Sequence, residues 1–231
     1  MKAFTIAIDG PVAAGKGTIA LDLAKKLNGI YLYTGAMYRA LALACFEKKI
    51  SVFDEEKVLE ILHNIEIEVD GEKSFLNGED VTERVKFQDV AQGASDVSVF
   101  PSIRKVMVQK QQKIAEKFIN KGKIVICEGR DAGTAIFPES PFKIFLTASP
   151  EVRAKRRLAQ FRELGREESF ETVLTETKKR DKNDSEREAD PLVSNPKEYG
   201  YFVLDNSDLT EEETVKIITE EIKKRGLYDT N

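Results

Sequence analysis

A glycine-rich segment near the start of the chain carries the clearest chemical signal in the sequence. It consists of Gly10, Pro11, Val12, Ala13, Ala14, Gly15, Lys16, Gly17 and Thr18. Glycines at both ends let the backbone curl so that successive N–H groups point inward, and such a curl binds phosphate oxygens. Lys16 would add a positive charge near the β and γ phosphates, and Thr18 would offer a hydroxyl to Mg²⁺ one position later than usual. The segment therefore predicts a P-loop that binds a nucleoside triphosphate.

The residues on either side of this loop provide the context that a P-loop requires. Residues 3–8 form an apolar run that predicts a buried strand. From Lys16 onward, apolar residues recur at helical spacing, namely Ile19, Leu23 and Leu27. A loop between a strand and a helix gains further N–H donors from the first turn of that helix. The alternative interpretation is a glycine-rich turn that binds no ligand.

Segments typical of strands and helices alternate along the rest of the chain. Strands are expected at residues 30–33, 123–127, 142–146 and 201–204, and helices at 35–46, after Asp54, from Pro101, from Ser149 and after Thr210, which forms a capping box with Glu213. This alternation predicts an α/β fold of three layers with a central parallel sheet of about five strands. Between residues 65 and 81 the rhythm changes, and two Asp-Gly or Asn-Gly turns predict a small antiparallel insertion.

The composition excludes several classes of protein. Of the 231 residues, 41% are hydrophobic and 33% are charged, which excludes collagen-like and wholly disordered chains. The longest apolar runs reach about six residues, whereas a membrane helix needs about 20. There is no leader-like segment, and the two cysteines show no disulfide or metal spacing. We therefore expect a cytoplasmic protein with no membrane partner.

The charge distribution is more informative than the net charge. A net charge of −4 argues against general affinity for a nucleic acid, so no nucleic-acid partner is expected. Residues 153–187 nevertheless contain 11 Lys or Arg against 8 Asp or Glu. In an acidic protein this local excess favours a small anionic ligand, although a solvated helix face would have a similar composition.

Several sequence blocks, taken in order, resemble those of the bacterial cytidylate kinases, which are nucleoside-monophosphate kinases of the P-loop class. The blocks are Ile8–Pro11 leading into the P-loop, Tyr33–Arg39, Glu128–Thr134, Arg180–Arg187 and Asp190–Leu192. The Gly-Lys-Gly-Thr ending of the P-loop and the insertion at 65–81 also resemble that family. The resemblance implies transfer of the γ-phosphoryl group of ATP to CMP or dCMP, with Mg²⁺ as the cofactor.

The same resemblance implies how a single kinase domain over residues 1–231 is organised. The core would comprise residues 1–34, 84–150 and 190–231. A monophosphate-binding region would span 35–83, and a helical lid would span about 151–189. Nothing in the sequence demands an assembly larger than a monomer.

Carried over position by position, the resemblance assigns roles to charged residues that lie far apart in the chain. The residues implied in binding CMP are Thr34, Arg39, Arg104, Arg130, Asp131, Asp184 and Arg187. The implied catalytic residues are Lys16, Arg130, Arg153, Arg157 and Arg180, of which the last three would close over the transferring phosphate. Glu128 stands where the family usually has Asp and would assist Thr18 in holding Mg²⁺ through water.

Elementary chemistry agrees with an arginine-rich site and still leaves alternatives open. Transfer between phosphates needs alignment and charge neutralisation rather than a strong base, and planar guanidinium groups bind phosphate through two hydrogen bonds. Polar side chains alone do not identify the base, so a kinase for UMP or AMP stays possible. A regulatory P-loop switch would need a guanine-reading Asn-Lys-x-Asp element, and none follows Leu146. An inactive nucleotide-binding scaffold is the third alternative.

Overall fold

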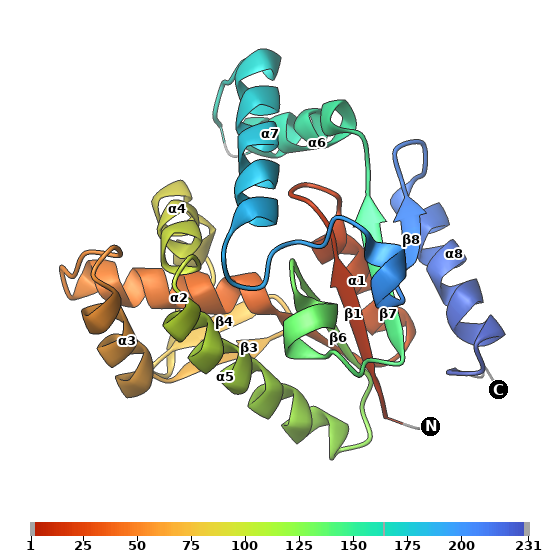
Figure 1. Ribbon diagram of the computed structural model, residues 1–231, viewed down its shortest axis with the longest axis horizontal. Helices are drawn as coiled ribbons and strands as arrows, with labels where there is room; N and C mark the ends of the chain where they lie inside the picture. Colours follow the sequence, from red (N-terminus) through yellow and green to blue (C-terminus); the bar gives the residue numbers. More distant parts are fainter. Residues whose placement is uncertain (1–2, 164, 229–231) are drawn as a thin grey trace.

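A five-stranded parallel sheet forms the centre of the molecule (Figure 1). The structure is a computed structural model and describes residues 3–163 and 165–228. The strands of this sheet are β1 (Thr5–Asp9), β2 (Ile30–Tyr33), β6 (Val125–Gly129), β7 (Phe142–Thr147) and β8 (Phe202–Asp205). They lie in the order β2-β6-β1-β7-β8, so β1 has a parallel neighbour on each side. The predicted α/β class and the expected number of core strands are confirmed.

Helices cover both faces of this sheet. Helices α1 (Lys16–Lys26) and α8 (Glu211–Lys224) pack on the face that carries Ile6 and Ile8. Helices α2 (Thr34–Glu47) and α5 (Pro101–Ile119) pack on the opposite face, which carries Ala7 and Cys127. Because both faces are buried, each central strand is apolar almost without interruption. The capping box that the sequence predicts at Thr210 and Glu213 is present at the start of α8.

The antiparallel insertion is also confirmed. It consists of β3 (Ile67–Asp70), β4 (Lys73–Leu76) and β5 (Glu79–Asp80), which form a separate three-stranded sheet against α2. Helix α3 (Glu55–Asn64) precedes it, and helix α4 (Gln88–Val97) follows it after a short turn at Arg84–Lys86. Helix α4 was not predicted, and it packs against α2. Two further short turns lie at Ala132–Ile136 and Pro196–Tyr199.

Helices α6 (Pro150–Glu163) and α7 (Phe170–Glu186) project from the sheet as a pair (Figure 1). Ala154, Leu158, Phe161 and Val173 form an apolar cluster of their own between the two helices, apart from the two cores beside the sheet. Because this pair has its own small core, the rest of the molecule must hold it in place by other contacts. Within residues 3–163 and 165–228, no helix combines the length and apolar character needed to cross a membrane.

Some element ends differ from the sequence prediction. The strand expected at 123–127 is β6 and begins at Val125, because the Lys123 N–H still closes the preceding helix by bonding to the Phe118 carbonyl. The first strand extends to Asp9, where a turn was expected. Strand β6 also extends past Cys127 to Gly129, so Asp9 and Glu128 both lie at the carboxyl edge of the sheet, where the P-loop begins.

Candidate active site

The P-loop follows β1 at the carboxyl edge of the sheet, and its backbone needs glycine at both ends. Gly10 has φ of +151°, and a Cβ atom there would lie 2.0 Å from the Leu146 carbonyl oxygen. Gly15 adopts a left-handed conformation, with φ of +88°, directly before helix α1. These two positions bring the loop close to β7 and then turn it into the helix, so the N–H groups of the first turn of α1 face the loop interior.

Lys16 is buried inside this loop. Its Nζ atom donates a hydrogen bond to the Pro11 carbonyl oxygen at 2.8 Å. Burial, followed by the positive charge of Arg130, lowers the pKa of Lys16 to about 7. A lysine whose charge is disfavoured in this way is stabilised by an arriving polyanion.

A cavity of about 570 Å³ opens in front of the P-loop, between β2, α2, the end of β6, α4 and α7. Most of the residues expected at the site line it: Val12, Ala13, Gly15, Lys16, Gly17, Thr18, Thr34, Arg39, Arg104, Glu128, Arg130, Asp131, Arg157, Arg180, Asp184 and Arg187. Gly10, Pro11, Ala14 and Arg153 do not line it. Residues that are up to 175 positions apart in the sequence thus meet around one space.

Arginine side chains on one side of the cavity are paired with carboxylates. Arg104 is almost fully buried and bonds to Asp131 and, at 2.9 Å, to Asp190. Arg130 donates to Asp184 at 2.6 Å. Burial alone would lower the pKa of Arg130, but the charge of Asp184, its hydrogen bond and the charges of Glu128 and Asp9 together raise that pKa.

Of the other arginines that line the cavity, Arg187 lies 3.6 Å from Asp131, and three have no carboxylate partner among the described residues. Among the described residues, no carboxylate lies within ion-pair distance of Arg39, Arg157 or Arg180, and the buried Nε atom of Arg180 has no hydrogen-bond partner. Burial, reinforced by the charge of Arg130, lowers the pKa of Arg180 to about 10. Burial likewise lowers the pKa of Arg157. The three side chains are half-buried, and Arg39 donates to the Val85 carbonyl oxygen at 3.0 Å. A partly desolvated guanidinium without a counter-charge is stabilised by an anion, so these groups mark an anion site.

Arg153 lies elsewhere than the sequence analysis expected. Its guanidinium is buried, pairs with Asp181 and donates to the carbonyl oxygens of Ala148 and Val12. These protein groups bind its Nε and Nη1 atoms, and Arg153 is not among the residues that line the cavity. The expected role of Arg153 in closing over the transferring phosphate stays a prediction, and the contacts described here favour a supporting role.

The cavity also contains residues that sequence reasoning did not select. Ser95 and Ser98 come from α4 and the residue after it, Lys86 from the preceding turn, Tyr38 from α2, and Gln160 from α6. Tyr31 and Tyr33 stack with ring centroids 5.9 Å apart along the same wall. The spacing of Val90, Ala94 and Val97, all buried, was the signal that could have revealed α4 and with it the two serines.

Asp9 is a further charged residue that the sequence analysis left without a role. It is fully buried at the end of β1 and accepts hydrogen bonds from the backbone N–H groups of Ala132 and Gly133, each at 2.7 Å. The hydroxyl of Tyr201 donates to it at 2.6 Å. Burial raises the pKa of Asp9 to about 6 although these donors oppose the rise. Asp9 thereby holds the turn that directly follows Arg130 and Asp131.

The donor atoms present fit Mg²⁺ rather than a transition metal. Thr18 and Glu128 both line the cavity beside Lys16 and offer hard oxygen ligands. Within the described part of the chain, no group of three or more His, Cys, Asp or Glu side chains could hold a metal unaided. Mg²⁺ usually keeps several waters and binds through one or two protein oxygens together with substrate phosphates, and this donor set suits that mode.

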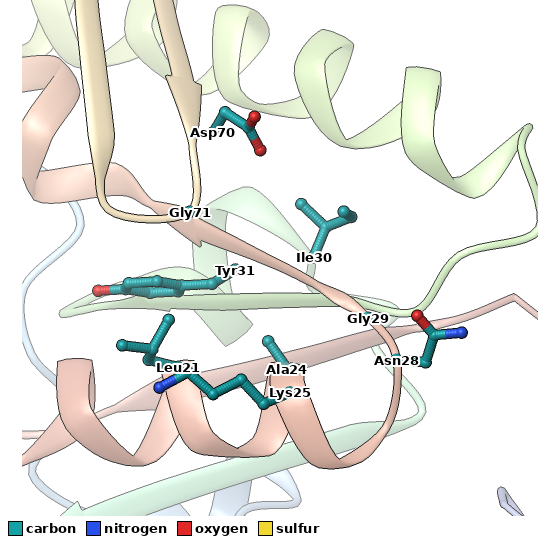
Figure 2. A pocket seen from close by; sticks show the side chains of 9 residues that line it. All are labelled: Leu21, Ala24, Lys25, Asn28, Gly29, Ile30, Tyr31, Asp70 and Gly71. Carbon is teal, nitrogen blue, oxygen red and sulfur yellow. The ribbon is translucent and has the colours of Figure 1, made fainter.

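A second, smaller cavity lies on the outer side of α1 (Figure 2). Its volume is about 230 Å³. The β3–β4 turn at Asp70 and Gly71 lies on one side of the Tyr31 ring, and Leu21 and Lys25 of α1 lie on the other. It shares only Leu21 and Tyr31 with the larger cavity. None of the predicted site residues lines it, so the chemistry belongs to the larger space.

Comparisons with known proteins agree with this geometry. The chain is 47% identical over 219 residues to a cytidylate kinase of Caldanaerobacter subterraneus subsp. tengcongensis, covering 95% of this chain and 94% of the relative. It is 40% identical to a cytidylate kinase of Bacillus subtilis, covering 97% and 99% of the two chains. A crystal structure of an uncharacterized protein from Eubacterium ventriosum shares the fold with a TM-score of 0.55 at 16% identity, covering 96% of this chain and 99% of that chain. The family model described as cytidylate kinase matches residues 6–224, and the chain therefore belongs to the cytidylate kinase family.

Proposed function

We propose that this protein transfers the γ-phosphoryl group of ATP to CMP or dCMP. The observation that carries the proposal is one cavity in which a P-loop faces three arginines that lack carboxylate partners within residues 3–163 and 165–228. Two polyanions must meet in such a reaction, and their charges must be neutralised at the point of transfer. The family to which the chain belongs favours a cytidine monophosphate as the acceptor.

On the donor side, the P-loop N–H groups and Lys16 would bind the β and γ phosphates of ATP. Thr18 would hold Mg²⁺ directly and Glu128 through water. When bound, Mg²⁺ neutralises charge on the phosphate oxygens and helps to align them. The lowered pKa of Lys16 supports this assignment, because triphosphate oxygens would restore the stability of its charged form.

On the acceptor side, Arg39, Arg104, Arg130 and Arg187 would bind the phosphate and base of CMP together with Thr34 and Asp131. Asp184 would position the pentose. Arg157 and Arg180 would bind the phosphoryl group as it moves between the substrates. In this proposal, residues 35–83 form the monophosphate-binding region and residues from about 151 to 189 form the lid, as the sequence analysis expected.

All of these groups come from one chain, which supports a monomer as the working unit. Both cysteines, Cys45 and Cys127, are free and buried. This agrees with the reducing cytoplasm, in which we propose that the protein works. No role in binding nucleic acid is needed to explain any residue of the cavity.

The proposal is tested by a coupled assay with ATP and each of AMP, CMP, dCMP, UMP and GMP. We expect turnover to be fastest with CMP or dCMP, and a clear preference for AMP would overturn the assignment. Lys16→Ala should lower kcat on the order of 10²–10³-fold, because a positioned charge is lost at the transferring phosphates. Lys25→Ala is the matched control, since Lys25 lies on the same helix with an exposed side chain and should leave kcat unchanged.

A further inference from the structure

Val12, in the middle of the P-loop, contacts the α6–α7 helix pair through both of its backbone polar groups. Its N–H donates to Oδ1 of Asp181 on α7 at 3.4 Å. Its carbonyl oxygen accepts from Nη1 of Arg153 on α6 at 3.1 Å. These contacts join segments that are 169 and 141 positions apart in the sequence. One loop residue thus touches both helices.

The two side chains that reach Val12 also bind each other. Nη1 of Arg153 lies 2.7 Å from Oδ2 of Asp181 and 3.0 Å from Oδ1. The Arg153 side chain is 5% exposed, whereas that of Asp181 is 22% exposed. Nε of Arg153 also donates to the Ala148 carbonyl oxygen at 2.8 Å, at the entry to α6. A largely desolvated pair with its hydrogen bonds satisfied is held in one geometry, and loss of either partner leaves the other without compensation.

We propose that Arg153 and Asp181 are positioning residues that fix helix α7 relative to the P-loop. We call their ion pair, with its two hydrogen bonds to Val12, the latch. The inference rests on the proposed function, because its purpose is to hold the groups of α7 opposite the donor phosphates. It assigns Arg153 to the support of the site rather than to contact with the phosphate.

The sequence positions on α7 explain why this contact matters for the cavity. Asp181 directly follows Arg180 and precedes Asp184 by three residues, so the three lie on one turn of the helix. Asp184 binds Arg130, and Arg180 enters the cavity without a partner. With Asp181 tied to the P-loop and Asp184 tied to the end of β6, both sides of that turn are anchored. Arg180 then cannot shift without breaking one of the two anchors.

The apolar packing of α7 does not replace the latch. The buried contacts of α7 are with α6, through the cluster that contains Phe161 and Val173. Those contacts hold α7 to α6 but not to the P-loop. Without the latch, the Asp184–Arg130 pair still holds α7, and Arg156 of α6 still donates to the carbonyl oxygens of Ala14 and Asn206. The turn of α7 that carries Arg180 then has one anchor in place of two and can shift relative to the P-loop. A displacement of about 1 Å at a reacting group can cost about 10²-fold in rate.

The first test measures amide hydrogen exchange in residues 170–186 and 10–18 of the full chain without nucleotides. Asp181→Ala and Arg153→Met should each speed exchange in both segments by about tenfold or more. The double variant should add little to either single variant, because both remove the same contact. Lys178→Ala is the matched control, since the exposed Lys178–Glu151 pair at 4.0 Å joins the same two helices without touching the P-loop. It should leave exchange unchanged.

The second test separates positioning from a merely structural role. With ATP and CMP, Asp181→Ala should lower kcat by about 10–100-fold and raise the KM for CMP, whereas the ATP KM should change little. Asp181→Asn keeps an acceptor for the Val12 N–H and should recover part of the lost rate. If Asp181→Ala fails to fold, Asp181→Asn carries both tests, with smaller changes in the same direction.

Each result decides the matter. Unchanged exchange in the P-loop and α7 of the variants overturns the latch, as does faster exchange with wild-type kcat and KM. If the variants exchange faster but the unmodified protein does not phosphorylate CMP, the proposed function is contradicted. The latch is then confirmed as a contact, but without its proposed purpose.

Discussion

Five arginines of the cavity fall into two groups, of which one is paired with carboxylates of the protein and the other is not. Arg104 and Arg130 bind carboxylates of the protein, namely Asp131, Asp190 and Asp184. Arg39, Arg157 and Arg180 have no carboxylate within ion-pair distance among the described residues. In the first group the protein itself compensates the charge. In the second group compensation must come from a ligand.

The pKa directions of Arg104, Arg130, Arg157 and Arg180 follow the same division, whereas burial lowers the pKa of Arg187 although it lies near Asp131. Burial alone would lower the pKa of Arg104, but the charge of Asp131 raises it, and Arg130 behaves in the same way with Asp184. For Arg180 burial is reinforced by neighbouring arginines, and the pKa falls to about 10. A free-energy cost is therefore stored at Arg180 in the free protein, and phosphate binding would release it. The paired arginines should therefore matter for stability as well as for binding CMP, and the unpaired ones chiefly for turnover.

Arg104→Met should give the largest effect on stability. The change leaves Asp131 and Asp190 without the buried guanidinium that binds them, so the free energy of unfolding should fall by about 3–5 kcal/mol. Urea unfolding of the free protein measures it. Arg84→Met breaks an exposed pair with Asp89 and should cost less than about 1 kcal/mol. Equal losses in the two variants would show that burial does not distinguish these pairs.

Arg180→Met should lower turnover strongly and leave stability intact. We expect kcat with ATP and CMP to fall on the order of 10²–10³-fold, because a positioned charge is lost from the transferring phosphoryl group. The free energy of unfolding should stay the same or rise, because a buried and unpaired charge has been removed. The coupled assay and urea unfolding check both parts, with Lys179→Met, an exposed neighbour on α7, as the control. A loss of stability comparable to that of Arg104→Met would abolish the distinction between the groups.

The parts of the molecule that could be predicted from the sequence are those specified by local signals. The P-loop, the five core strands, the insertion at 65–81 and the Thr210 cap each depend on a few neighbouring residues. Glycine spacing, apolar runs and capping pairs act over one turn or one strand. Such signals lead to the correct fold because local preference and tertiary structure agree.

The division between paired and unpaired arginines could not be predicted in this way. Arg153 and Arg157 lie one helical turn apart on α6, yet the first is buried against Asp181 and the second lines the cavity. Tertiary contacts between α6, α7 and the P-loop determine which of these two arginines binds a carboxylate. The resemblance placed all of these arginines near phosphate, and only the contacts separate their roles.

Asp9 was missed for a related reason. The sequence Asp9-Gly10 is typical of a turn that ends a strand, and the strand was expected to stop at Ile8. In the structure Asp9 continues β1 and is fully buried, because two backbone N–H groups and the Tyr201 hydroxyl converge on it from distant segments. A local sequence pattern cannot predict hydrogen-bond donors that come from residues far away in the chain.

Asp9 extends the comparison to a buried charge that is held by hydrogen bonds and not by an arginine. Its pKa in the folded protein is about 6, above the ordinary value of 3.8, and burial is the main cause. Because the folded pKa lies above the unfolded one, this group contributes stability that is fully present below about pH 4. That contribution is lost as the pH rises through about 6.

Tyr201→Phe should therefore have a smaller, pH-dependent effect. The Tyr201 hydroxyl stabilises the ionised form of Asp9, so its removal should raise the Asp9 pKa further and extend the loss to higher pH. The free energy of unfolding should fall by about 2 kcal/mol at pH 8 and by much less at pH 5, where the carboxyl is mostly protonated. Urea unfolding at both pH values measures this, and Asp9→Asn should remove the difference between them. Tyr199→Phe, at an exposed tyrosine nearby, should change nothing. Because phenylalanine keeps the ring that meets Phe145 edge-on, an equal loss at both pH values would come from a hydroxyl contact that does not depend on the charge of Asp9, and it would contradict the prediction.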